Sequence, residues 1–121
     1  MENQANSFSN VTGRYAKSIF QLANEKKIMN EVEKNFLQIN SLFSDSKDFV
    51  KFVTNPTIQK NTRLKIIENL SIKLNFNSYF ANFLKLMNEK GRFFYLERIV
   101  KDFFSILSIS KGEISAELIV A

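Results

Sequence analysis

Apolar residues recur every three or four positions from about residue 9 to about residue 109. This spacing is typical of amphipathic helices, because it places the apolar side chains on one side of a helix. The pattern predicts six helices, at about residues 10–26, 30–43, 45–53, 57–74, 77–90 and 93–109. We therefore expect an all-α fold in which residues 1–110 form a six-helix bundle.

Residues with known preferences for helix ends mark several of these boundaries. Asn10 or Thr12 can cap the start of the first helix. Pro56 disfavours a helical backbone at the residue before it, so it separates the third helix from the fourth. Gly91 tolerates a left-handed backbone and is expected to end the fifth helix.

The last residues of the chain follow a different pattern. Residues 113–121 are rich in residues that favour strands and alternate loosely, and then the sequence stops. A lone strand leaves its backbone groups unpaired. We therefore expect residues 111–121 to be a linker and the first strand of a C-terminal domain that this chain lacks, so that the chain is a truncated form of a longer protein.

Two of the predicted helices carry more apolar surface than a single core contact would cover. The first and the fifth each have an inner apolar face and a second apolar stripe beside it. The flanking stripes consist of Val11, Tyr15, Ser18 and Leu22 on the first helix and of Tyr79, Phe83 and Leu86 on the fifth. If the inner faces pack together, these stripes form a groove that suits an amphipathic helix. Alternatively, both helices are central and buried on two sides, and periodicity alone leaves both possibilities open.

Four short motifs resemble those of a known family. Residues 14–23 read R-Y-A-K-S-I-F-Q-L-A and resemble the R-Y-A-K-A-L-F-x-L-A signature of the delta subunit of F-type ATP synthase, whose mitochondrial relative is the oligomycin-sensitivity-conferring protein. The N-P-T-I at 55–58 resembles the family's N-P-x-I turn, and N-E-K-G-R at 88–92 resembles its E-N-G-R or E-N-K-R helix end. Residues 116–121 are similar to the A-x-V-x-T-A stretch that leads into the family's C-terminal domain.

The resemblance implies a non-catalytic peripheral-stalk (stator) subunit that supports proton-driven ATP synthesis. In such a subunit, the first and fifth helices of the N-terminal domain hold the N-terminal helix of an alpha subunit of the catalytic head. The C-terminal domain, absent here, holds the b subunits of the stalk. Tyr15, Ser18 and Leu86 match positions of the family's groove. Helical geometry extends the predicted partner-binding set to Val11, Leu22, Tyr79, Phe83 and Lys90.

The expected location is the cytoplasmic face of a bacterial inner membrane, reached only indirectly through the complex. This expectation combines the resemblance with two features of the sequence. The polar N-terminus lacks the basic and apolar regions of a signal peptide. No stretch of the sequence approaches the apolar length that a membrane span requires.

Composition narrows the chemistry that the chain could perform. The 121 residues include no Cys and no His, which excludes disulfides, thiol catalysis and the common zinc sites. The three glycines are too scattered to form a phosphate-binding loop. Most carboxylates, Asp102 among them, lie near lysines or arginines in a mixed pattern typical of solvated faces. We therefore expect no catalytic residue, no metal site and no cofactor.

The net charge of +5 leaves a basic helical RNA-binding module as an alternative function. The fourth predicted helix carries four basic residues, namely Lys60, Arg63, Lys65 and Lys73. Such a patch would contact phosphates non-specifically. No aromatic residue lies among these side chains to stack bases, so we interpret them as a solvated face and expect no nucleic-acid partner.

Arg92 has two interpretations. It pairs with an acidic partner residue, or it bonds to the last carbonyls of the fifth helix or to Glu89.

Overall fold

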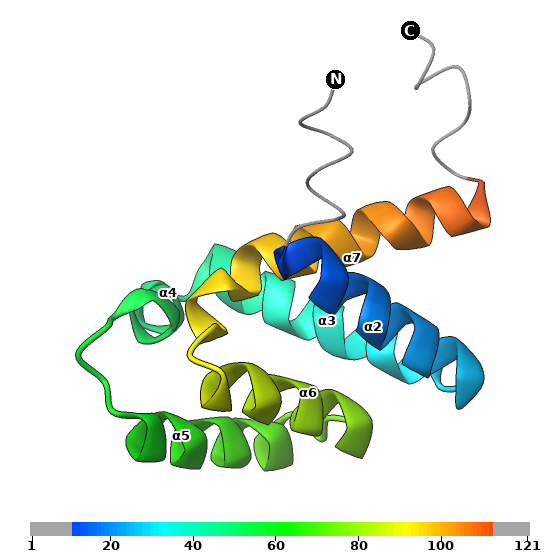
Figure 1. Cartoon of the computed structure of the whole chain (residues 1–121). Helices are drawn as coiled ribbons and strands as arrows, with labels where there is room; N and C mark the ends of the chain where they lie inside the picture. The colour runs from blue at the N-terminus through cyan, green and yellow to red at the C-terminus, as the bar shows by residue number, and fades with distance from the viewer. Residues whose placement is uncertain (1–10, 113–121) are drawn as a thin grey trace, which may run out of the picture.

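The computed structural model describes residues 11–112, which form a bundle of α-helices with no strand among them (Figure 1). The helices are α2 (Val11–Glu25), α3 (Met29–Asp45), α4 (Lys47–Thr54), α5 (Lys60–Lys73), α6 (Ser78–Glu89) and α7 (Leu96–Lys111), with a 3-10 turn η1 (Phe93–Tyr95) before α7. The predicted all-α bundle is confirmed over this range. Asn10 and the β-prone residues 113–121 lie outside the described residues.

The helices are arranged in two groups that meet at α6 (Figure 1). α2 packs mainly against α7, and α3 packs against α2, α4 and α7. α5 and α6 run side by side as a hairpin, and the aromatic side chains of α6 join this hairpin to α3. α6 therefore has one side on α5 and another on the remaining helices.

Side-chain caps fix the starts of two helices. The Ser46 hydroxyl accepts a hydrogen bond from the Phe49 backbone N–H at 3.1 Å, which makes Ser46 the cap of α4. The Asn77 side chain accepts from the Tyr79 N–H at 2.8 Å and caps α6. Both contacts satisfy backbone donors that a helix start leaves without partners. Thr12 is no such cap, because it lies inside α2 with its hydroxyl turned to another helix.

Gly91 ends the fifth predicted helix, as expected. Its φ of +72° is left-handed, and its N–H donates to the Asn88 carbonyl at 3.1 Å. The next N–H, that of Arg92, donates to the Met87 carbonyl at 2.8 Å. This pair of bonds occupies carbonyls at the end of α6, where the chain turns into η1.

Two predicted helix starts differ most from the structure, by three residues each. The fourth helix begins at Lys60 instead of residue 57, because Asn55 Oδ1 accepts hydrogen bonds from both the N–H and the hydroxyl of Thr57, at 2.9 and 2.7 Å. These local bonds hold a turn that competes with helix formation. The sixth begins as the 3-10 turn η1, and its α-helical part runs from Leu96 to Lys111.

The core is built from stacked and edge-on aromatic rings. Phe36 of α3 lies parallel to Phe103 of α7, with centroids 4.1 Å apart, and edge-on to Phe80 of α6 at 4.8 Å. All three are fully buried, so one cluster joins three helices. Leu37 and Ile66 are 49% and 39% exposed. Each is adjacent in sequence to a fully buried residue, Phe36 or Ile67, and therefore points about 100° away from the core direction.

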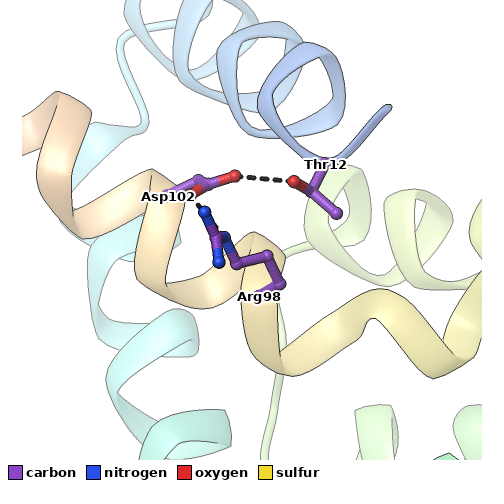
Figure 2. Close-up of polar contacts among 3 residues, drawn as sticks. All are labelled: Thr12, Arg98 and Asp102. Carbon is purple, nitrogen blue, oxygen red and sulfur yellow. Dashed lines mark hydrogen bonds and ion pairs between the residues drawn. The ribbon is translucent and has the colours of Figure 1, made fainter. Parts of the chain in front are cut away.

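A buried polar contact ties the first turn of α2 to α7 (Figure 2). The Thr12 hydroxyl donates to Asp102 Oδ2 at 2.8 Å, and Arg98 Nε donates to Asp102 Oδ1 at 3.3 Å. The expectation that Asp102 lies on a solvated face is wrong, because this residue is only 4% exposed. Its two donors satisfy the carboxylate inside the bundle.

Candidate partner-binding groove

α2 and α6 meet where Tyr15 stands against Phe83. Their ring centroids are 6.1 Å apart and the rings are edge-on, at 70°. The residues of the predicted stripe on α2 are spaced four, three and four positions apart, and those of the stripe on α6 are spaced four and three positions apart. Such spacings place each stripe on one side of its helix. The contact therefore brings together two of the residues predicted to line opposite sides of a groove.

The structure separates the floor of this groove from its sides. Phe83 is 8% exposed and also packs against Phe36 and Phe80, with centroids at 6.2 and 6.3 Å. It forms the floor, and its accessible surface is small. Leu86 and Tyr79, one turn away on either side of it, are 44% and 38% exposed.

The remaining predicted residues are accessible to different extents. On α2, Ser18 is exposed, whereas Val11, Tyr15 and Leu22 are half-buried. Lys90 is exposed at the end of α6, where its N–H donates to the Leu86 carbonyl at 3.0 Å. α6 is buried on two sides, against α5 and against α3, as the alternative interpretation expected. Tyr79 and Leu86 nevertheless remain exposed, so burial on two sides leaves two residues of the predicted stripe accessible.

Arg92 crosses from the turn after α6 to α2. Its Nη1 donates to the Tyr15 hydroxyl at 3.4 Å, and its guanidinium lies 5.9 Å from the centre of the Tyr15 ring. Within the described residues, the side chain therefore bonds neither to the last carbonyls of α6 nor to Glu89. The bond to an α6 carbonyl comes from the Arg92 backbone N–H. A pocket of about 340 Å³ opens beside this contact, lined by Val11, Arg14, Tyr15, Ser18 and Arg92.

Periodicity did not identify Arg14 and Arg92 as groove residues. Helical periodicity is defined by the apolar positions, so it gives no information about which charged residues lie beside them. The available signal was the position of Arg92 directly after the helix-ending Gly91, where the chain reverses. At the other end of the groove, Lys26 Nζ lies 5.6 Å from the centre of the Tyr79 ring.

Two of the four basic residues of α5, Lys60 and Arg63, bond to backbone carbonyls, whereas Lys65 and Lys73 are exposed. Arg63 is 8% exposed and donates to the carbonyls of Phe52, Asn55 and Ile58 at 2.6, 3.0 and 3.3 Å. Burial lowers the pKa of its guanidinium from the ordinary value. Lys60 Nζ donates to the Glu89 carbonyl at 2.8 Å. The expectation of a solvated face is therefore wrong for Arg63.

A second cavity, of about 480 Å³, lies beside Arg63 between the 55–58 turn, α6 and η1. Its lining is mostly apolar.

Among residues 11–112, no group of acidic side chains gathers closely enough to hold a metal ion. No helix in the same range has the length and apolarity that a membrane crossing requires.

Comparison with known proteins identifies relatives across nearly the whole chain. The family described as ATP synthase delta (OSCP) subunit matches residues 11–121. "ATP synthase subunit delta" of Pelagibacter ubique (strain HTCC1062) is 34% identical over 106 residues, covering 88% of this chain and 57% of that protein. The protein of the same name from Rhizobium johnstonii is 36% identical over 110 residues, covering 91% of this chain and 58% of that protein.

A solved structure shows the same fold. A chain in the cryo-EM structure of the Toxoplasma gondii mitochondrial ATP synthase hexamer matches with a TM-score of 0.75 and 26% identity, covering 78% of this chain and 52% of that one. The chain described here spans a little over half the length of the relatives it matches. These matches give no support to the RNA-binding alternative. The chain belongs to the ATP synthase delta (OSCP) subunit family.

Proposed function

We propose that this chain is the N-terminal domain of a stator subunit of F-type ATP synthase, and that its groove binds the N-terminal helix of an alpha subunit. The single observation that carries the proposal is the Tyr15–Phe83 contact, which joins α2 to α6 while Leu86 and Tyr79 stay open to solvent. Family membership supports the identity of the complex, and the groove supports the kind of partner.

The physical basis of such binding is burial of apolar surface. Each Å² of apolar surface that leaves water contributes about 25 cal/mol, less the cost of ordering the partner. A groove with a rigid aromatic floor keeps that cost low on its own side, because Phe83 is held by the core in advance. The domain thus acts as a passive attachment point, and the stator function requires no chemistry from it.

The rest of the proposal concerns the parts of the complex beyond the groove. Residues 1–110 form the helical domain, and residues 111–121 lead into a C-terminal domain that holds the b subunits. The assembled subunit restrains the catalytic head against the membrane sector during proton-driven ATP synthesis. It lies at the cytoplasmic face of a bacterial inner membrane and reaches the membrane only through the complex.

Calorimetry with a peptide of the alpha-subunit N-terminus from the same organism tests the groove. Leu86→Asp places a charge on its open apolar side and is expected to weaken binding by more than about 30-fold, the effect of losing a central anchor. Leu37→Asp is the matched control, since Leu37 is also an exposed leucine, at 49% against 44% for Leu86. Equal affinities for the two variants would remove the groove assignment. Unchanged circular dichroism of both variants shows that neither has unfolded.

A further inference from the structure

We propose that the pocket formed by Arg14, Tyr15 and Arg92 receives an acidic side chain of the docked helix. This pocket would select the partner helix and fix its register along the groove. The inference rests on the proposed function, because it concerns the same site. It adds a charge requirement to a groove whose predicted stripes are mostly apolar, and it develops the interpretation in which Arg92 pairs with an acidic partner residue.

The pocket has a positive charge that the described part of the chain does not neutralise. Two of its five lining residues are arginines, and both side chains are exposed. Within residues 11–112, the ion pairs are those of Glu68, Asp102 and Glu33 with other cations, so none involves Arg14 or Arg92. A carboxylate is the side chain that such a pocket complements best.

Arg92 presents its guanidinium beside the Tyr15 ring. Its backbone N–H is bonded to the Met87 carbonyl, and its guanidinium rests on the Tyr15 ring. Among residues 11–112, its guanidinium donates one hydrogen bond, the long 3.4 Å bond to the Tyr15 hydroxyl. A guanidinium has five N–H donors in a rigid fork, so others remain for a carboxylate.

The position of the pocket gives it a role in register. Val11, Tyr15 and Ser18 belong both to the pocket and to the α2 side of the groove. An acidic residue seated there therefore fixes which turns of the partner reach Leu86 and Tyr79. The same arginines could instead contact the C-terminal end of the partner helix, which carries a partial negative charge, and this is the alternative that the experiment must separate.

The test is calorimetry of the alpha-subunit peptide with the whole chain at low and high salt. The variants are Arg92→Gln, Arg14→Gln and, as a control, Lys34→Gln, which changes the net charge equally at an exposed site on α3. Each Asp or Glu of the peptide is changed in turn to its amide. We expect Arg92→Gln to weaken binding about fivefold at low salt and less at high salt. One acidic position of the peptide should give a similar loss with the wild-type chain and no added loss with Arg92→Gln.

Each other result overturns a distinct claim. If the wild-type chain fails to bind the peptide, the proposed function is wrong and this inference is wrong with it. If the peptide binds but Arg92→Gln behaves like Lys34→Gln, the groove stands and the acidic-residue pocket is wrong. If Arg92→Gln weakens binding but no acidic position of the peptide matters, the arginines contact the helix end and the inference is again wrong.

Discussion

Two polar side chains inside the bundle make contacts that hold separate segments together. Asp102 accepts from Thr12 across 90 residues of sequence, and Arg63 bonds three carbonyls near the 55–58 turn. Sequence alone placed both residues on solvated faces, since a charged residue in a helix is most often exposed. Spacing shows one partner of Asp102, Arg98 four residues earlier on α7, but not Thr12 on α2. The partners of Arg63 also escape it, because they are carbonyls of α4 and of the turn before α5.

Removing the Thr12 hydroxyl is expected to destabilise the domain. Thr12→Val keeps the shape of the side chain but takes one donor from the buried Asp102, so the free energy of unfolding should fall by about 1–2 kcal/mol. Urea denaturation measures the change. Thr62→Val, at an exposed position on α5, is the control and should stay within about 0.5 kcal/mol of wild type. Equal effects of both substitutions would show that the Thr12–Asp102 bond contributes nothing.

Arg63 should matter more to stability than its exposed neighbour on the same helix. Arg63→Met leaves three carbonyls without their donor, so we expect a loss of about 2–3 kcal/mol in the free energy of unfolding. Lys65→Met, two residues along, is exposed and should change stability little. Chemical denaturation of both variants compares the two positions. A wild-type midpoint for Arg63→Met would contradict the structural role described for this side chain.

Helices and turns were the features that the sequence predicted best. Gly91 ends its helix as expected, and Asn55-Pro56 separates α4 from α5. The error at the start of α5 came from Thr57, whose bonds to the Asn55 side chain stabilise a turn over a helix start. The exposure of Leu37 and Ile66 shows that the core faces of α3 and α5 are narrower than their runs of apolar residues.

The turn after α6 gives a prediction about backbone strain. Gly91 has a φ of +72°, and a Cβ built there meets nothing within 4 Å, so Gly91→Ala should cost only the conformational penalty, about 1 kcal/mol. Gly91→Asn should cost less, because asparagine tolerates left-handed backbone better. Thermal unfolding of both variants measures which substitution lowers the stability more. A greater loss for Asn than for Ala would contradict this explanation.

At the scale of the whole molecule, the groove depends on how α2 and α6 approach each other. The periodic pattern predicted which stripes lie on each helix, and this part follows from geometry along the chain. It could not predict that Phe83 is the floor, nor that Arg92 reaches Tyr15 from 77 residues away. Both features arise from packing between segments that are distant in sequence.

The measurement that most directly tests the groove is NMR mapping of the isotope-labelled chain during titration with the alpha-subunit peptide. Binding in the groove predicts the largest changes in amide shifts at Ser18, Leu86 and their neighbours, with little change around Ile58 beside the second cavity. Shift changes concentrated around Ile58, or a complete lack of change at saturating peptide, would contradict it.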